Sequence, residues 1–335
     1  MALTAAVDLT ICSKEFQERH PQLYHYTSTT GLEGIVRSQT LRATDYRSLN
    51  DSSEVVHIKE PFIACLVPRF QSTVDQLNPS RHLRRTLETT GGCEKLARDF
   101  VDSLYQATFE SSGGFTFVEA FIACFCTHAE DRSYVQQHGL LSQWRGYSGG
   151  DGFCIVFDTP RLCRRFAKEF DAHYWVYLRS DAVRYAVDEV PLDELFPELV
   201  EAGAKTLKDF LLARIRTPEM GIVEFLTGAT LFKHQGFLEE REVRIVAIPG
   251  TKALSDQGKR EHADFPDLPL PNILTNPDNG RRYIPLFDGI SSQLPIVRVI
   301  VGPSRSQTAN ARFARSVVGS EIPVICSATP WLPPA

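Results

Sequence analysis

Apolar positions recur along the chain with two different periods, and the changes between them predict where strands and helices lie. Runs that alternate apolar and polar side chains, or that are rich in aromatic and β-branched residues, predict strands; apolar residues at every third or fourth position predict helices. Predicted strands cover 22–28, 40–45, 115–128, 153–157, 173–187 (one or two strands) and 241–249. Predicted helices cover 31–38, two or three segments within 51–112, 140–147, 160–170 and most of 187–235. The end of the chain, from Pro295 to Thr329, predicts a strand–helix–strand unit.

Strands dispersed among helices indicate an α+β protein with a single mixed β-sheet core. We expect one domain over 1–335, with helical insertions near 60–112 and 160–235. The segment 250–280 breaks both periods, because its prolines, asparagines and glycines deny it an apolar face. It is predicted to be an irregular, exposed loop.

Composition indicates a soluble globular protein: 335 residues, 43% hydrophobic and 23% charged. No apolar run reaches the roughly 18 residues that span a bilayer, and the start of the chain lacks a basic region, so we expect a cytoplasmic protein without membrane contact. The net charge of −5 argues against a mainly electrostatic grip on nucleic acid.

Eight cysteines lie scattered through apolar segments without paired spacing, and we interpret them as reduced core residues. The nearest approach to a metal motif is Cys124 and Cys126 followed by His128. On a strand these side chains are spaced too regularly for a zinc knuckle, so core packing is the preferred interpretation and no metal is predicted. The glycine-rich phosphate-binding and nucleophile-elbow motifs are also absent from the sequence.

The first predicted strand carries a histidine between two tyrosines, in "LYHYT". Alternation places His25 on one face of the strand and Tyr24 and Tyr26 on the other. His25 is interpreted either as a hydrogen-bonded core histidine or as a residue that lines a cleft.

A second candidate lies in "KHQGFLEEREVRIVAIPG", where a helix is expected to end near Gly236 and a strand to follow. Alternation puts Glu240, Glu242 and Arg244 on one face of that strand. This arrangement is typical of a solvated strand face with ion pairs. It also suits a site in which carboxylates hold a ribose and stabilise an oxocarbenium ion.

The motifs "LYHYTS", "GIV", "LRAT", "LND..E", "ACFCTH", "QWRGYSGGDGFCIVFD", "KHQGFLEEREVRI" and "VRVIVGPS" occur in an order that resembles the bacterial domain-of-unknown-function family numbered 2971. The looser parts are 60–112, 160–230 and 250–294. That family is remotely similar to ADP-ribosyltransferases, so the resemblance implies an ADP-ribosyltransferase-like fold and NAD as substrate. It further implies transfer of ADP-ribose to a protein or nucleic acid, in a toxin or phage-defence setting.

On this resemblance the catalytic residues are Glu242, or Glu240 if the register differs, and His25. The contacts to NAD that it implies are His25, Tyr26, Thr27, Trp144, Tyr147 and Arg244. His25 and Glu242 would then lie on neighbouring strands and face one cleft bordered by Tyr147 or Trp144. Glu242→Gln would stop transfer and leave folding nearly intact.

Two other functions remain open from the sequence. A nuclease would need a divalent-metal cluster, for which Asp51, Glu54 and His57 are the nearest grouping, although their spacing is helical. A non-catalytic sensor module would bind a nucleotide or a partner protein without turnover. The structural alternative for Trp144 and Tyr147 is that they are core anchors with polar tips, and for Asn50 and Asp51 that they cap a helix.

Overall fold

The computed structural model describes residues 11–49, 55–77, 81–89, 91–109, 119–147, 151–186, 190–211 and 222–331. The chain divides into two compact units. One is built from 1–49, 120–182 and 238–335, and the other from 50–119 and 183–237. The predicted α+β class with a mixed sheet is confirmed.

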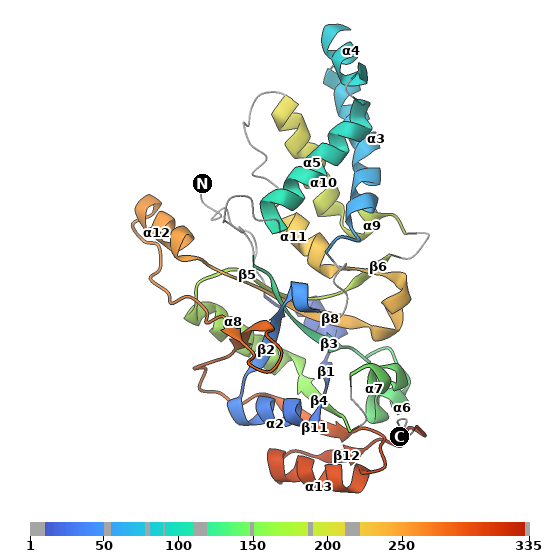
Figure 1. The fold of residues 1–335 in the computed structure, drawn as a ribbon, viewed down its shortest axis with the longest axis vertical. Helices are drawn as coiled ribbons and strands as arrows, with labels where there is room; N and C mark the ends of the chain where they lie inside the picture. Colours follow the sequence, from blue (N-terminus) through green and yellow to red (C-terminus); the bar gives the residue numbers. More distant parts are fainter. Residues whose placement is uncertain are drawn as a thin grey trace. The chain divides into compact units, whose positions relative to one another are not determined.

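The first unit is organised around a ten-stranded sheet. Its strands are β1 (Gln22–Thr27), β2 (Leu41–Asp45), β3 (Phe121–Cys126), β4 (Phe153–Asp158), β5 (Trp175–Ala182), β8 (Glu242–Pro249), β9 (Leu274–Thr275), β10 (Arg282–Leu286), β11 (Ile296–Val301) and β12 (Val324–Cys326). The order runs β12-β11-β4-β1-β3-β2-β10-β9, and β8 lies between β3 and β5 (Figure 1). β11 and β12 are parallel, and the other pairs in this sheet are antiparallel.

Strand β3 is the branch point of this sheet. Along one side it pairs with β8 over its whole length. Along the other side it pairs with β1 at Cys126 and with β2 at Phe121 and Ile122. Two strands therefore share one edge of β3 and leave a fork between them, because neither covers the middle of β3.

Helices cover one face of the sheet with an apolar layer. They are α1 (Lys14–Arg19), α2 (Thr29–Ser38), α8 (Thr159–Ala172) and α13 (Gln307–Val318). Phe16, Leu32, Phe166 and Ala314 from these helices pack in one buried cluster with inward residues of the strands. On the other face, α6 (Ser133–His138) leads to α7 (Leu141–Tyr147), which carries Trp144 into a smaller buried cluster. The sheet thus has one largely apolar face and one face with both apolar and polar groups.

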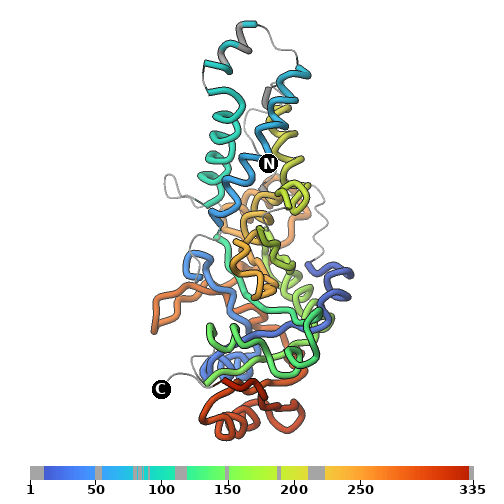
Figure 2. The backbone as a smooth tube through the Cα atoms, turned by 90° about the vertical axis from the view of Figure 1, so that its right-hand side faces the viewer, coloured from blue at the N-terminus to red at the C-terminus, as the bar shows by residue number. Residues whose placement is uncertain are grey.

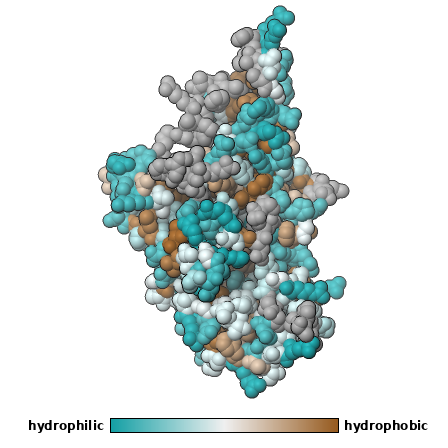
Figure 3. Space-filling view, viewed as in Figure 1, coloured by the Kyte–Doolittle hydropathy of each residue, from teal (hydrophilic) through white to brown (hydrophobic). Residues whose placement is uncertain are grey.

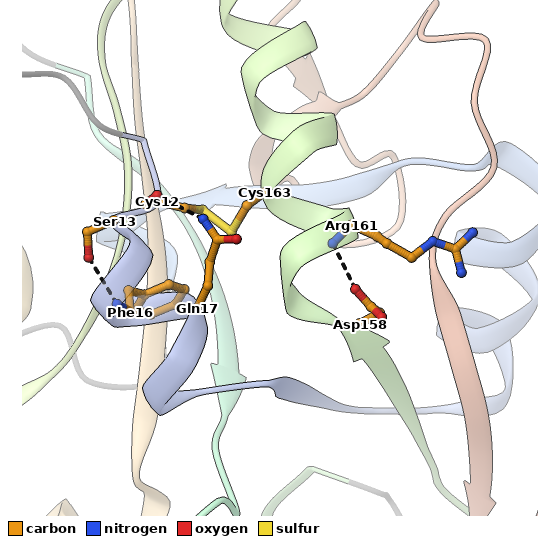
Figure 4. Close-up of a disulfide and its surroundings, with 7 residues drawn as sticks. All are labelled: Cys12, Ser13, Phe16, Gln17, Asp158, Arg161 and Cys163. Carbon is orange, nitrogen blue, oxygen red and sulfur yellow. Dashed lines mark hydrogen bonds between the residues drawn. A yellow bond between two sulfur atoms is a disulfide. The ribbon is translucent and has the colours of Figure 1, made fainter.

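Local sequence signals explain where two of these helices begin. The Ser28 hydroxyl accepts from the Gly31 amide, so α2 begins two residues before the predicted start at Gly31. The Asp158 carboxylate accepts from the Arg161 amide at 2.8 Å and caps α8, whose second residue is Pro160 (Figure 4).

The second unit is mainly helical. Its elements are α3 (Lys59–Leu77), α4 (Arg81–Thr89), α5 (Gly92–Phe109), β6 (Arg184–Ala186), α9 (Leu192–Leu195), α10 (Pro197–Leu211), α11 (Ile222–Leu231) and β7 (Phe232–His234). α3 and α5 lie side by side (Figure 2), and Phe62, Tyr105 and Phe109 pack around Phe225. β6 and β7 form a separate parallel pair.

Three sequence predictions are corrected. The segment 250–280 contains helix α12 (Lys252–Glu261), because Thr251 caps it by accepting from the Leu254 amide. The long strand predicted over 115–128 is β3 alone among its described residues. The helix predicted to end near Gly236 ends at Leu231, and a 3₁₀ segment, η2 (Gln235–Glu240), precedes β8. A second 3₁₀ turn, η1 (Tyr46–Ser48), follows β2.

The cysteine prediction is also wrong for one pair: Cys12 and Cys163 form a disulfide (Figure 4). Both residues are buried, their Cα atoms are 5.8 Å apart, and the bridge spans 151 residues of sequence. It links the segment before α1 to α8, where apolar surroundings gave no pairing signal. Beside it the Ile11 carbonyl accepts from the Ser180 amide and extends the hydrogen bonding of β5. The bridge therefore anchors a segment that covers a strand at the edge of the sheet.

Most apolar residues are buried inside the two units, and the hydropathy of the surface is consistent with this burial. On the face shown in Figure 3, hydrophobic residues gather mainly in small patches among hydrophilic ones. None of the helices in the described ranges is both long and apolar enough to cross a membrane.

Removing the bridge by Cys12→Ser is expected to lower the free energy of unfolding of the oxidised protein by about 2–4 kcal/mol, because a long closed loop restricts the unfolded chain. Urea unfolding with and without reductant measures this. Cys326→Ser, at an exposed free cysteine, is the matched control. Equal stability of Cys12→Ser and the oxidised parent would show that the bridge does not stabilise the fold.

Candidate functional site

The structure separates the two residues that the predicted NAD site must bring together. β3 lies between β1 and β8, and Tyr24, Cys126 and Glu242 form one row across the three strands. Residues in such a row share a face, so alternation places His25 on the opposite face from Glu242. The predicted convergence of His25 and Glu242 on one ribose is therefore wrong.

His25 lies at the fork beside β3. Its Nδ1 is 3.0 Å from the Cys124 carbonyl oxygen, and its ring packs on Phe125 at 5.5 Å. Burial lowers the pKa of His25 below the ordinary 6.5, although the hydrogen bond to Cys124 opposes this shift. His25 is half-buried, and its neutral imidazole bonds a strand carbonyl in the fork. Thr27, at the end of β1, pairs with Phe153.

Glu242 and Arg244 form a bidentate ion pair at the start of β8. Arg244 Nε donates to Glu242 Oε1 and Nη2 donates to Oε2, both at 2.9 Å. The Arg244 side chain is 0% exposed and that of Glu242 is 6% exposed. Each charge offsets the desolvation of the other, so this pair orients two side chains in the interior of the unit.

Glu240 and Tyr147 meet at a more open position. Glu240 ends the 3₁₀ segment η2, outside the strand alternation assumed from sequence. It accepts from the Tyr147 hydroxyl at 3.3 Å, and Tyr147, the last residue of α7, is 40% exposed. Trp144 instead is fully buried and donates from Nε1 to the His138 carbonyl, as a core anchor would. Tyr147 therefore lies beside the acidic segment, and Trp144 does not.

A hydrogen-bonded chain that the sequence did not predict connects Tyr26 to the residue before Glu242. Tyr26 Oη is 3.0 Å from His128 Nε2, and His128 Nδ1 is 2.9 Å from Asp131 Oδ2. Asp131 Oδ1 then accepts from Arg241 Nη1 at 3.0 Å. Tyr26 also accepts from the Leu140 amide. The only sequence signal was His128 in the "ACFCTH" motif, which cannot show its partners.

The ionisable groups in this hydrogen-bonded chain behave as parts of a buried structural network. Burial lowers the pKa of His128, and its bond to Asp131 opposes the shift; burial raises the pKa of Tyr26 well above 10.0. His128 is thus held neutral and Tyr26 is held protonated. Arg241 adopts a left-handed φ of 43°, which costs energy in a residue other than glycine and turns the chain from η2 into β8.

On the same face, Arg298 on β11 closes a neighbouring set of contacts. It donates to Gln22 Oε1, to the Tyr24 hydroxyl and to the Gln136 carbonyl, each at 3.0 Å. Tyr24 packs against His128 in a tilted arrangement with ring centroids 4.5 Å apart. The polar groups of the first strand on this face are therefore bonded internally.

A cavity opens elsewhere in the same unit, at the carboxyl ends of the parallel strands β11 and β12. Its volume is about 490 Å³, and it is lined by Pro303, Ser304, Gln307 and the segment Ser327–Trp331. In open sheets, ligands bind outside the carboxyl ends of parallel strands. Sequence analysis predicted the strand–helix–strand unit but did not identify this position.

The floor of the cavity is held by side-chain bonds to backbone. Gln307 Nε2 donates to the carbonyl oxygens of Ser327 at 2.9 Å and Gly302 at 3.2 Å. The Ser327 hydroxyl donates to the His138 carbonyl at 2.6 Å. A Cβ at Gly302 would lie 2.9 Å from the Gly152 carbonyl oxygen, so only glycine permits this close approach of two loops.

The residues proposed for a metal-dependent nuclease are only partly described. Asp51 and Glu54 lie outside the described residues, and His57 packs near His234 in the second unit. Within the described ranges, no group of three or more His, Cys, Asp or Glu side chains is arranged to hold a metal ion.

Glu242→Gln is expected to lower the free energy of unfolding by about 3–5 kcal/mol, since it removes the carboxylate charge that faces the buried Arg244 guanidinium. This replaces the sequence-based expectation of nearly intact folding. Urea unfolding of the variant measures the loss, with Glu239→Gln, at an exposed neighbouring carboxylate, as control. Equal stability of the two variants would refute a structural role for the pair.

Stability is expected to fall in mild acid. Burial lowers the pKa values of His20, His25 and His128 below 6.5 in the folded protein. The unfolded chain therefore binds more protons between the folded pKa values and 6.5, and stability is lost as pH falls through that window. Urea unfolding between about pH 7.5 and about pH 5.5 measures the loss, and His128→Gln should make it shallower. Higher stability at the acidic end would contradict the assignment.

A known protein family matches part of the chain that contains the candidate site residues. Residues 143–245 match the family described as "Protein of unknown function (DUF2971)". The matched segment includes Trp144, Tyr147, Glu240, Glu242 and Arg244. No curated protein and no solved structure gave a significant match. The match supports the resemblance to this family, over the segment from α7 to the first half of β8.

Proposed function

We propose that this protein is a small-molecule-binding module whose ligand occupies the cavity at the carboxyl ends of β11 and β12. The observation that carries the proposal is the cavity itself: about 490 Å³, within the roughly 300–1,000 Å³ typical of ligand pockets. Its lining combines an aromatic ring, two prolines and several hydroxyl and amide groups. Such a mixture supplies apolar contact and a few orienting hydrogen bonds.

The hydrogen bonds on the sheet face that carries Glu242 favour ligand binding, and not group transfer, as the leading proposal. Both Glu242 oxygens accept from Arg244, and His128 bonds to Tyr26 and Asp131. His25, which a transferase site of the predicted form requires, points to the other face. Glu242 therefore bonds to Arg244, and His25 lies on the opposite face of the sheet from both.

Transfer of ADP-ribose from NAD to a protein or nucleic acid is the second candidate. The observation that favours it is Glu240 beside the exposed ring of Tyr147. There the ring would stack on NAD, and the carboxylate would stabilise positive charge at the anomeric carbon. The order of the sequence motifs, which resembles ADP-ribosyltransferases remotely, points to the same candidate, in a form in which the His25 side chain has no role.

Ser304→Trp should abolish ligand retention, because an indole placed on the cavity wall fills the space. The full chain is dialysed against a small-molecule cell extract supplemented with NAD and ADP-ribose, and retained compounds are identified by mass spectrometry. We expect the parent protein to retain at least one compound more than tenfold better than Ser304→Trp does, the equivalent of about 1.4 kcal/mol.

Ser320→Trp, in the exposed turn after α13, is the matched control for an added indole and should retain the same compound. Failure of the parent to retain any compound, or equal retention by Ser304→Trp, refutes the module. Isotopically labelled NAD added to a parallel sample reports nicotinamide release. Release that is lost in Glu240→Gln and kept in Glu239→Gln would make ADP-ribose transfer the better account.

A further inference from the structure

Strand β12 ends the sheet and turns backbone groups outward along its open side. Among the described strands it pairs with β11 alone, in parallel. The Ser327 amide donates to the Val301 carbonyl on β11 at 2.9 Å. Backbone groups alternate sides along a strand, so those of Ile325 also face β11, whereas those of Val324 and Cys326 face away from it. An edge of this kind is a template for another strand.

The register makes this edge complementary to itself. If β12 of a second copy pairs antiparallel about a two-fold axis at Ile325, Val324 lies opposite Cys326 of the second copy. Both residues present their N–H and C=O groups to the interface, so each such pair exchanges both hydrogen bonds. The Ile325 side chains then face each other across the axis in the closer, non-hydrogen-bonded kind of pair. Ile325 is 38% exposed in the single chain, so this contact buries apolar surface.

The other end of the sheet, β9, is less suited to pairing. It also exposes an apolar side chain, because Leu274 is 43% exposed. However, β9 is 2 residues long, and Pro271 and Pro277 lie close on either side of it. Proline supplies no N–H to an additional strand and blunts an edge. Beside β12, Pro323 directs its carbonyl to Val299 on β11, so its missing N–H does not lie on the open side.

Helix α13 adds charge complementarity to the same two-fold arrangement. It packs on the sheet face above β11 and β12, through Ala311 and Ala314 (Figure 1). Because it connects two parallel strands, it runs opposite to β12, and its last turn lies near the start of β12. The second copy would bring the start of its own α13 to this place. Exposed Arg305, which precedes that start, would then lie beside exposed Glu321, which follows the end of α13 in the first copy.

We infer that the protein forms a symmetric dimer in which the β12 edges of two copies pair antiparallel and join their sheets. Three features carry this inference: the outward backbone groups of β12, the exposed Ile325 at the axis and the opposite charges at the two ends of α13. It does not depend on the proposed function, because none of Val324, Ile325 and Cys326 lines the cavity. So short a strand buries little area, so we expect a reversible dimer with a dissociation constant in the micromolar range or weaker.

Sedimentation velocity of the full chain over about a hundredfold range of concentration tests the inference. The parent should shift from monomer to dimer as its concentration rises. Ile325→Lys should weaken the dimer about tenfold or more, because it places like charges directly opposite each other at the axis. Leu274→Lys puts the same charge on the other edge of the sheet and is the matched control, which should dimerise as the parent does.

A second variant acts on the backbone of the edge. Val324→Pro removes an N–H that faces the open side and no hydrogen bond to β11. It should therefore weaken the dimer, while circular dichroism and urea unfolding of the monomer remain close to those of the parent.

Cross-linking tests the register. Ile325→Cys, made together with Cys326→Ser, should form a disulfide between two chains when glutathione disulfide is supplied, because the paired Cα atoms at the axis would be about 4.5 Å apart. The two protein thiols are oxidised to the disulfide, and glutathione disulfide is reduced to two molecules of glutathione. In the parent, the Cys326 residues of the two copies are diagonal neighbours about 7–8 Å apart and should not cross-link. The parent shares the other free cysteines and is the control.

Three outcomes overturn the inference. A parent that stays monomeric over the whole concentration range refutes the dimer. A dimer that is weakened by Leu274→Lys and unchanged by Ile325→Lys places the interface at β9 and not at β12. Cross-linking of the parent to the same extent as the Ile325→Cys variant refutes the antiparallel register.

Discussion

The pairing of β3 with three other strands is the constraint on which the rest of the first unit depends. β3 gives one whole edge to β8 and divides the other edge between β1 and β2. This division sets the row of Tyr24, Cys126 and Glu242, and with it the face of each side chain on these strands. It also leaves β3 carbonyl groups at the fork, where the Cys124 oxygen bonds to His25. A histidine at this position compensates for a backbone partner that the branching of the sheet removes.

Desolvation explains why the polar residues of the sheet bond to one another. A buried guanidinium or carboxylate is costly to leave without a partner, and Arg244 satisfies both oxygens of Glu242. The same cost keeps His128 neutral between Tyr26 and Asp131. These networks specify how α6 and η2 pack against the sheet, so mutations in them act first on folding and only indirectly on any ligand.

The cavity at the end of β11 differs from these networks because its groups are fixed by the backbone and still face open space. Gly302 allows two loops to approach closely, and Gln307 ties the loop after β12 to the end of β11. Packing of Trp331 against the buried cluster then places an aromatic ring at the opening. Gly302 and Gln307 thus stabilise the floor of the cavity, whereas other residues form its accessible walls. Residues in the walls can therefore be substituted without loss of the fold.

The sequence by itself determined the elements and their local limits. Its apolar periods predicted β1, β2, β4, β8 and the final strand–helix–strand unit, because alternation and helical spacing are properties of neighbouring residues. Alternation also correctly separated His25 from Tyr24 and Tyr26. The helix inside 250–280 also has a local signal, because Thr251 immediately precedes α12 and caps it.

Only the tertiary structure decided which faces and which distant residues meet. The row that joins Tyr24 to Glu242 depends on strand order and register, which a period of two cannot fix. The pairing of Cys12 with Cys163 and the bond between His128 and Tyr26 bring together residues more than a hundred positions apart. Such contacts follow from the global packing of the chain, because no local pattern records which partner a buried polar group will find.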